Sequence, residues 1–291
     1  MLFGKLTYFT QTMDNFFLQN GVKIPSIGLG TWENRDEQSV LESISEALKI
    51  GYRHIDTAAV YANEKFIGKA IRQVGIDRHE LFITSKVWNT ERGYAKTMRA
   101  FEKTLNDLQT DYLDLYLVHW PASPSKYENW AELNAETWHA LEDLYKMQKV
   151  RAIGVSNFWI HHLEPLLNIA NIVPMVNQIE YHPGYRQNYV VDYCKAHDML
   201  VEAWSPLGRG KMFAVPELVD MAAKYGVTVA QLCVKWCLQN GILPLPKSTK
   251  PERLKENADV EGFTISPADM KTINSLQLES SSGQFPDEID F

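Results

Sequence analysis

The chain of 291 residues is poor in cysteine. It has only Cys194, Cys233 and Cys237, an odd number without the spacing of a disulfide framework or of a zinc site. We expect reduced structural thiols, because free cysteine is usually buried, and hence a reducing compartment such as the cytoplasm. Long apolar runs are also missing. None approaches the roughly 20 residues that span a bilayer, so we expect no membrane partner.

An excess of positive charge is absent as well. The chain has 29 lysine and arginine residues against 36 aspartate and glutamate residues, a formal net charge of −7. Nucleic-acid binding needs a positive surface, so this balance argues against such a partner. Residues 1–13 lack the pattern of a signal peptide and any helix or strand periodicity. We interpret them as a disordered extension, a tag remnant or an early start assignment, with Met13 as an alternative start.

Short apolar strands and amphipathic helices alternate along the rest of the chain. The dipeptide Asn20-Gly21 suits a type I′ turn and predicts a hairpin over residues 15–24. Eight strands are then predicted, over 26–31, 52–58, 81–88, 111–121, 150–158, 174–183, 199–208 and 241–249. The predicted helices cover 36–50, 63–74, 93–108, 134–149, 159–169, 187–197, stretches of 216–239, a start at 252, and 267–275.

Eight strand–helix repeats in roughly 250 residues are the count of a TIM barrel. No linker rich in proline, serine or glycine interrupts them, so residues 14–291 are predicted to form one α/β domain, a (β/α)8 barrel with an N-terminal hairpin. The polar ending SSSGQFPDEIDF is predicted to be a short C-terminal tail. A doubly wound open sheet has the same periodicity and stays open as an alternative.

Each predicted strand ends in polar or aromatic residues. In a barrel these ends meet at one face, where the chemistry sits. A single such residue has an ordinary structural explanation, with Asp56 as a helix cap, Lys86 as a surface lysine and His119 as a core histidine. Eight matching placements make that explanation hard to sustain for all of them. In chain order the residues are Thr31, Asp56, Lys86, His119, Ser156 and Asn157, Gln178, Trp204 and Ser205, and Lys247 and Ser248.

The stretch HIDTAAVYANE places Tyr61 five residues after Asp56, across small side chains. A phenol has a pKa of about 10 and is a poor proton donor near neutrality, but a nearby ammonium lowers that pKa. A buried Lys86 would need a carboxylate such as Asp56 to stay charged. We therefore predict a general acid, Tyr61, with a lowered pKa, beside an imidazole, His119, that binds a carbonyl oxygen. Asn63 remains a candidate helix cap.

These residues belong to longer motifs that resemble the aldo-keto reductase superfamily. The resemblance covers about residues 15–291, and its ending GQFPDEIDF looks most like the bacterial branch that includes 2,5-diketo-D-gluconate reductases. The motifs are GYRHIDTAAVYANE, ITSKVWN, DLYLVHWP, GVSNF, VNQIEYHP, WSPLGRG and LPKSTKPERLKEN. The resemblance implies NADPH-dependent reduction of aldehydes and ketones to alcohols on a barrel, with a broad substrate range.

The same resemblance implies a role for each matched residue. Tyr61 would protonate the developing alkoxide, Lys86 and Asp56 would tune Tyr61, and His119 would orient the carbonyl. The residues expected to bind the cofactor are Thr31 and Asp56; Ser156, Asn157 and Gln178 at the nicotinamide carboxamide; Trp204 stacked on the nicotinamide; Ser205, Leu207 and Gly208 along the pyrophosphate; Lys247, Ser248 and Arg253 at the 2′-phosphate; and Glu256 and Asn257 at the adenine.

The phosphate assignment also follows from the residues, since two cations and a hydroxyl near a helix N-terminus suit an anion. KSTKPERLKEN is equally a plain helix start. No G-x-G-x-x-G follows the first strand, so a Rossmann site is not expected, and GRGK at 208–211 lacks the spacing of a P-loop. No metal site is expected either.

Trp32, Trp88 and Trp120 follow strand ends and are expected to line the substrate pocket, although core or rim packing explains each of them too. An aromatic wall favours small carbonyl compounds. We expect a monomer or weak oligomer. Two other functions stay open. An aldolase would need a neutral Lys86, which Asp56 disfavours. A non-catalytic NADPH-binding barrel would not need the intact catalytic residues.

Overall fold

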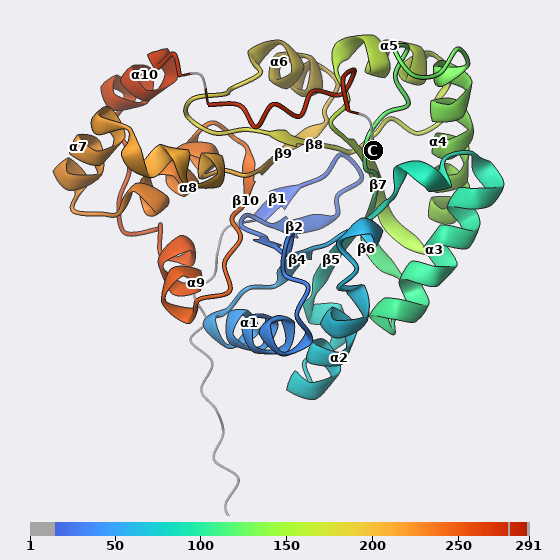
Figure 1. Ribbon diagram of the computed structural model, residues 1–291, viewed down its shortest axis with the longest axis horizontal. Helices are drawn as coiled ribbons and strands as arrows, with labels where there is room; N and C mark the ends of the chain where they lie inside the picture. The colour runs from blue at the N-terminus through green and yellow to red at the C-terminus, as the bar shows by residue number, and fades with distance from the viewer. Residues whose placement is uncertain (1–14, 279, 290–291) are drawn as a thin grey trace, which may run out of the picture.

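The computed structural model describes residues 15–278 and 280–289 and contains a ring of eight parallel strands (Figure 1). The strands follow one another around the ring in sequence order. A parallel bridge from Gly30 to Lys247 joins the first strand to the chain just past the last. The strands are β3 (Leu29–Gly30), β4 (His54–Asp56), β5 (Phe82–Val87), β6 (Leu113–Val118), β7 (Val150–Ser156), β8 (Val176–Glu180), β9 (Leu200–Trp204) and β10 (Leu243–Leu245).

This order confirms the predicted barrel, because a doubly wound sheet reverses its strand order at a switch point. The helices surround the ring, as Figure 1 shows. They are α1 (Glu37–Ile50), α2 (Glu64–Val74), α3 (Tyr94–Leu108), α4 (Trp130–Lys146), α5 (Ile160–Ile169), α6 (Asn188–Ala196), α7 (Pro216–Tyr225), α8 (Val229–Gln239), α9 (Pro251–Ala258) and α10 (Pro267–Ser275). The predicted helix over 134–149 begins one turn earlier, at Trp130, and ends at Lys146. Asn134 therefore lies inside the helix, where its side chain exchanges two hydrogen bonds with the backbone of Ala122.

Local sequence sets several helix ends. The Asp36 carboxylate accepts a hydrogen bond of 2.8 Å from the N–H of Ser39 and so begins α1. Thr228 and Gln231 exchange side-chain hydrogen bonds with each other's backbone N–H at the start of α8. These contacts satisfy N–H groups that the first helical turn leaves without partners. The helix positions therefore follow from short-range signals that are readable in the sequence.

The N-terminal hairpin exists, but its turn is not the predicted type I′. Strands β1 (Asn15–Phe17) and β2 (Lys23–Pro25) pair in antiparallel fashion. A type I′ turn needs positive φ at both central residues, whereas Gly21 has a φ of 80° and Asn20 is not among the described residues with positive φ. The chain instead forms a longer loop in which the N–H of Gly21 donates to the carbonyl of Leu18. The Asn20 side-chain amide donates a hydrogen bond to the carbonyl of Arg151, which lies on strand β7 of the barrel.

The core has two parts. Inside the ring, Leu18 and Ile24 of the hairpin region pack against the first residues of the strands, such as Phe82 and Leu243, so the hairpin closes the N-terminal end of the barrel. A larger apolar layer lies between the strands and the helices. All three cysteines are free and buried, as predicted, and burial raises the pKa of Cys194 to about 11 and that of Cys233 to about 12. These thiols are therefore structural.

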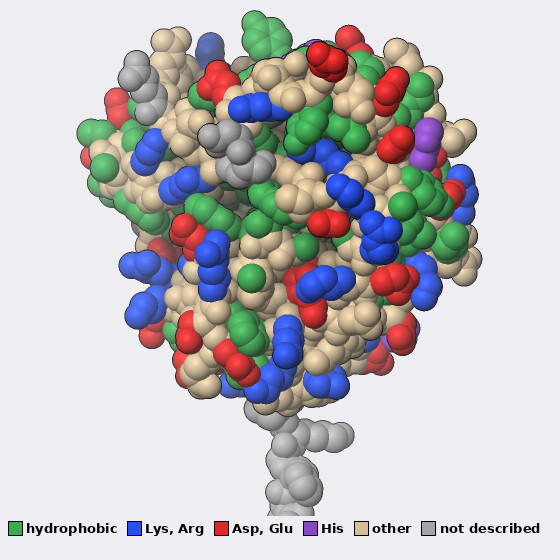
Figure 2. Space-filling model, turned by 45° about the vertical axis from the view of Figure 1, so that its right-hand side comes forward, with side chains coloured by type: hydrophobic (Ala, Val, Ile, Leu, Met, Phe, Trp, Pro, Cys, Tyr) green, Lys and Arg blue, Asp and Glu red, His purple; other side chains and the backbone are tan. Residues whose placement is uncertain are grey.

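The predicted polar tail runs back over the C-terminal face of the barrel (Figure 1). The Ser282 hydroxyl donates to Glu180 at 2.8 Å, and the ring of Phe285 lies 6.3 Å from that of Trp159. The prediction for residues 1–13, including Met13, lies outside the described residues. No helix in the described part of the chain is long and apolar enough to cross a membrane. On the face shown in Figure 2, acidic and basic side chains are interspersed.

Candidate active site

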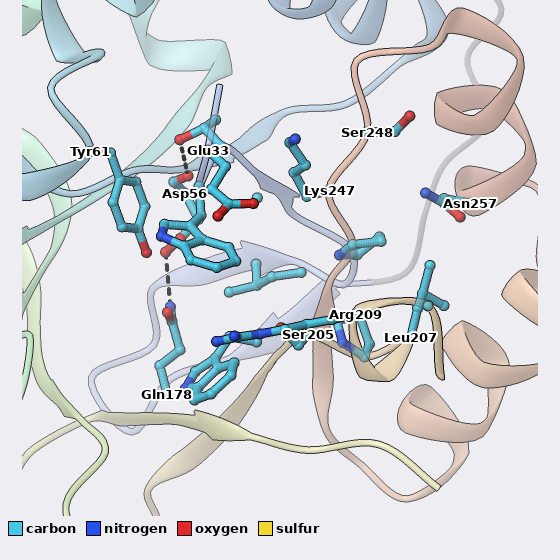
Figure 3. Close-up of a pocket in the computed structure, with 18 of the residues that line it drawn as sticks. Glu33, Asp56, Tyr61, Gln178, Ser205, Leu207, Arg209, Lys247, Ser248 and Asn257 are labelled. Atoms are coloured by element: carbon cyan, nitrogen blue, oxygen red, sulfur yellow. Dashed lines mark hydrogen bonds between the residues drawn. The ribbon is translucent and has the colours of Figure 1, made fainter. Parts of the chain in front are cut away.

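One cavity of about 970 Å³ opens at the C-terminal ends of the strands and contains nearly all of the predicted site residues (Figure 3). Two predicted residues are not part of its lining. Lys86 is fully buried behind Asp56 and Tyr61, and Gly208 lies in the turn that follows Leu207. The predicted residues that line the cavity are Thr31, Trp32, Asp56, Tyr61, Trp88, His119, Trp120, Ser156, Asn157, Gln178, Trp204, Ser205, Leu207, Lys247, Ser248, Arg253, Glu256 and Asn257.

A buried ion pair forms one end of the site. The Lys86 ammonium donates to Asp56 Oδ1 at 2.7 Å and to the carbonyl of Thr57 at 2.9 Å, and its side chain is 0% exposed. Asp56 ends β4 and Lys86 lies near the end of the neighbouring strand β5, so their pairing follows from the barrel register. A buried ammonium requires such a partner, because an unpaired charge in the interior is strongly destabilising.

Tyr61 lies beside this pair at the end of a short 3-10 helix, Ala59–Tyr61, and the Lys86 ammonium nitrogen lies 5.2 Å from the centroid of the Tyr61 ring. The prediction of a lowered pKa for Tyr61 is wrong. Burial raises the pKa of Tyr61, and the opposing effect of Lys86 is smaller, so the net pKa lies above the ordinary value of a phenol. Sequence could not show how deep the residue lies. A raised pKa keeps the phenol protonated, as a proton donor needs.

The charge on Lys86 is held firmly. Burial lowers the pKa of Lys86, but Asp56 and Tyr61 together raise it above the usual lysine value. The side chain therefore stays an ammonium ion. An aldolase lysine must be neutral to attack a carbonyl group, so this geometry disfavours that alternative.

His119 faces Tyr61 across the cavity, with ring centroids 5.7 Å apart, and lies 5.2 Å from the ring of Trp88. Burial, with the charge of Lys86 as a further cause, lowers the pKa of His119 well below its ordinary value. The imidazole is therefore neutral and carries a single N–H. One N–H beside the Tyr61 phenol suits a carbonyl oxygen, which can accept two hydrogen bonds.

Three polar residues lie at the end of β7 and on β8, and one of them, Gln178, contacts the ion pair. Gln178 Nε2 donates to Asp56 Oδ2 at 2.8 Å (Figure 3), and the Ser156 hydroxyl donates to the carbonyl of Gln178 at 2.8 Å. Asn157 Nδ2 donates to the carbonyl of His119, and Asn157 Oδ1 accepts from the Trp204 indole N–H at 2.8 Å. Asn157 adopts a φ of 63°, a strained value for a non-glycine residue that these bonds maintain.

The far end of the cavity lies at the start of α9. Lys247 and Ser248 follow β10, and the Ser248 hydroxyl accepts a hydrogen bond of 3.0 Å from the N–H of Lys250, the residue before the helix. Arg253 and Asn257 are on the helix itself and line the cavity. A helix N-terminus with nearby cations suits a phosphate group.

Sequence reasoning missed Arg209 and Gln284. The guanidinium carbon of Arg209 lies 4.7 Å from the ring of Trp32 and 5.7 Å from that of Trp204, and Nη2 donates to Gln284 Oε1 at 2.6 Å. Figure 3 shows Arg209 next to Ser205 in the pocket. GRGK lacks the spacing of a P-loop, but its arginine, a cation shortly after a strand end, is a signal that the sequence offers. Nothing local in the sequence places Gln284 there, because it lies on the returning tail.

Asn63 does not cap α2 with its side chain, contrary to the candidate role. Its amide donates to the carbonyls of Thr31 and Asn34, both at 3.0 Å, and accepts from the Thr57 hydroxyl at 2.7 Å. These contacts tie the loop after β3 to the connection between β4 and α2. The amide is thus used to fix the loops that carry Tyr61.

Among the described residues, one group of side chains has the proximity needed to hold a metal ion, namely His161, His162 and Asp287. It is not part of the cavity lining. The N–H of Trp159 donates to His162 Nδ1 at 3.2 Å, so a neutral ring carries its proton on Nε2, which faces Asp287 at 3.0 Å. A protonated nitrogen is no metal ligand. We interpret the group as an anchor for the tail.

The fold and the site define a class of protein, an α/β barrel with a tyrosine beside a buried ion pair in a large cavity at the C-terminal ends of its strands. The chain belongs to the aldo/keto reductase family, whose model matches residues 26–278. The resemblance seen in the motifs is thereby confirmed.

Relatives of known name agree with this assignment. Glyoxal reductase of Bacillus subtilis (strain 168) is 48% identical over 282 residues, which cover 97% of this chain and 99% of that protein. Methylglyoxal reductase DkgA of Escherichia coli (strain K12) is 38% identical over 274 residues, which cover 94% and 96%. The crystal structure of a Gox0644 mutant in complex with NADPH matches with a TM-score of 0.89 and 38% identity, and covers 97% of this chain and 100% of that chain.

Proposed function

We propose that this protein reduces aldehydes and ketones to alcohols with NADPH, and that Tyr61 donates the proton. Membership of the aldo/keto reductase family makes the chain an NADP-dependent oxidoreductase. The observation that carries the residue assignment is the buried Lys86–Asp56 pair next to Tyr61, with the Lys86 nitrogen 5.2 Å from the centre of the Tyr61 ring, in a cavity whose far end lies at the start of α9.

The residues present fit the cofactor. The cavity is large enough for a dinucleotide, and the Lys247 and Arg253 cations at its far end suit the 2′-phosphate of NADPH. NADPH, when bound, supplies the hydride that reduces the carbonyl carbon. The other expected contacts are Glu256 and Asn257 to the adenine, Ser205, Leu207 and Gly208 to the pyrophosphate, Trp204 to the nicotinamide ring, Ser156, Asn157 and Gln178 to its carboxamide, and Thr31 and Asp56 beside it.

The chain's own residues then manage the proton. His119, neutral, donates its N–H to the carbonyl oxygen and holds it next to Tyr61. Tyr61 donates its phenol proton to that oxygen as negative charge develops. The Lys86 ammonium stabilises the resulting tyrosinate, and it can do so because Asp56 keeps it charged in the interior.

Trp32, Trp88 and Trp120 give the substrate part of the pocket an aromatic wall. Such a wall supports small aldehydes and ketones over one bulky specific ligand. The names of the relatives, glyoxal reductase and methylglyoxal reductase, support small dicarbonyl compounds as the first substrates to test. A monomeric or weakly associated state and a cytoplasmic location remain predictions.

The test is NADPH oxidation, followed by absorbance, with glyoxal, methylglyoxal, simple aldehydes, keto-sugars and a bulky steroid ketone. We expect turnover of several small carbonyl compounds. NADPH binding without turnover of any of them would favour the non-catalytic barrel, and strict preference for the steroid would overturn the broad substrate range. Borohydride trapping of an adduct on Lys86 would restore the aldolase alternative.

A further inference from the structure

Glu202 is a buried carboxyl group that the proposed mechanism does not use. It lies in the middle of β9 and is 0% exposed. Its Oε2 accepts a hydrogen bond of 2.8 Å from Gln178 Nε2, while Oε1 has no hydrogen-bond partner among the described residues. Burying a carboxyl group with an unsatisfied oxygen is costly. Such a group at the base of an active site calls for a functional explanation.

The Gln178 amide connects Glu202 to the catalytic ion pair. Gln178 and Glu202 are register partners on β8 and β9, and Gln178 Nε2 donates both to Glu202 Oε2 and to Asp56 Oδ2, each at 2.8 Å. The two N–H groups of the amide are therefore both used inside the barrel. The remaining polar atom, Oε1, is left for the cavity that Gln178 lines. A flipped amide would direct its oxygen at two carboxyl groups instead.

Charge balance indicates which form Glu202 takes. Lys86 of β5 is the cation of this buried cluster, and it is paired with Asp56 of β4 at 2.7 Å. Gln178 of β8 offers Glu202 only a neutral amide. On the other side, the register partner of Glu202 on β10 is the apolar Leu243. Ionisation of Glu202 would leave one buried negative charge without a partner, so the carboxyl group keeps its proton. Burial and, after it, the charge of Asp56 raise the pKa of Glu202 from 4.5 to about 8.

We propose that Glu202, in its protonated form, is a positioning residue that holds the Gln178 amide with Oε1 toward the nicotinamide carboxamide. This inference rests on the proposed function. The carboxamide N–H₂ needs an acceptor, and the fixed amide oxygen provides one in a defined direction. Glu202 also leaves Asp56 as the sole anionic partner of Lys86 as long as it keeps its proton.

The first test compares Glu202→Leu with Glu202→Gln. Leucine removes the acceptor of the Gln178 N–H and frees the amide to turn, whereas glutamine keeps a carbonyl acceptor and resembles the protonated acid. We expect Glu202→Leu to raise the NADPH dissociation constant about tenfold, measured by tryptophan fluorescence, and to lower kcat by a similar factor. Glu202→Gln should stay within about twofold of the wild type at pH 7.

Val201→Ala on the same strand is the matched control. Val201 is buried in the layer beneath the helices, so its truncation destabilises the barrel without touching Gln178. If Glu202→Leu behaves like Val201→Ala, with a lower Tm but unchanged NADPH affinity and kcat, Glu202 has only a structural role. If Glu202→Gln is as damaging as Glu202→Leu at pH 7, the protonated form is not the working one.

Unfolding at different pH values tests the proton without any cofactor. The native state keeps a proton that the unfolded chain loses above about pH 4.5, so wild-type stability should decline relative to Glu202→Gln from pH 5 to 8. In kinetics, the wild-type kcat should fall relative to Glu202→Gln above pH 8, since a second anion strengthens the hold of Tyr61 on its proton. The proposal would be overturned if the wild type and Glu202→Gln showed the same pH dependence of both stability and kcat. If the wild type turns over no carbonyl compound, the proposed function fails, independently of any variant.

Discussion

The two ends of the pocket are built in opposite ways. At the catalytic end, Asp56, Lys86 and His119 are buried. Asp56 and Lys86 are held by their strands and by the hydrogen bond between them, and His119 follows the end of β6, where its backbone carbonyl accepts from Asn157. At the far end, Lys247 and Arg253 are exposed. In the interior a charge interacts strongly with its neighbours, while solvent and salt weaken the same interaction at the surface.

The difference separates chemistry from affinity. Proton donation needs groups already in place in a site that excludes water, because their electrostatic effect is largest there. Binding of a phosphate needs only enough positive charge, which flexible exposed side chains provide. Changes of the catalytic residues at the buried end should therefore alter rates and stability, and changes at the exposed end should alter cofactor affinity. Glu202 is proposed to act through the cofactor contact of Gln178, so its substitution should alter both.

The largest expected effect is that of Tyr61→Phe. The variant keeps the ring but loses the proton, so carbonyl reduction should fall by a factor of about 10² to 10⁴. NADPH affinity, measured by fluorescence titration, should stay close to that of the wild type. Wild-type rates in this variant would show that another group donates the proton. A loss of NADPH affinity as large as the loss of rate would break the separation of chemistry from affinity.

Asp56→Asn tests the buried pair. The change keeps the shape of the side chain but leaves the Lys86 ammonium unpaired, so the free energy of unfolding should fall by about 3–5 kcal/mol in urea denaturation. The exposed pair of Lys69 and Glu37, 2.6 Å apart, provides the matched control. Glu37→Gln should cost no more than about 1 kcal/mol. Similar losses of unfolding free energy in Asp56→Asn and Glu37→Gln would show that burial does not strengthen the Asp56–Lys86 pair.

The sequence predicted which residues meet at the site, but not how deeply they are buried. The polar residues after Ile55 and Val118 mark strand ends because apolar runs stop there, and the barrel then brings Asp56 and His119 together. The raised pKa of Tyr61 escaped prediction, since it depends on how much protein surrounds the phenol. The position of Gln284 in the cavity lining could not be predicted for another reason. It reaches Arg209 from 75 residues away, along a tail without periodicity.

At the exposed end, Arg253→Ala should weaken NADPH binding about tenfold or more, because a charge-assisted hydrogen bond contributes about 1.5–3 kcal/mol. NADH lacks the 2′-phosphate, so its dissociation constant should change much less. Lys255→Ala removes the same charge from α9 outside the cavity lining and is the control. Equal losses of affinity for NADPH and NADH would remove the phosphate assignment.

The smallest expected effect is that of Gln284→Ala. Loss of its hydrogen bond to Arg209 leaves that guanidinium less well held between Trp32 and Trp204, so the dissociation constant for NADPH should rise about two- to threefold, with kcat unchanged. Gln277→Ala, nearer α10 and outside the cavity lining, is the control for the tail. Tighter NADPH binding by Gln284→Ala would mean that Arg209 obstructs the cofactor. A change in kcat would mean that the tail acts on the buried end as well, and the contrast between the two ends would then no longer hold.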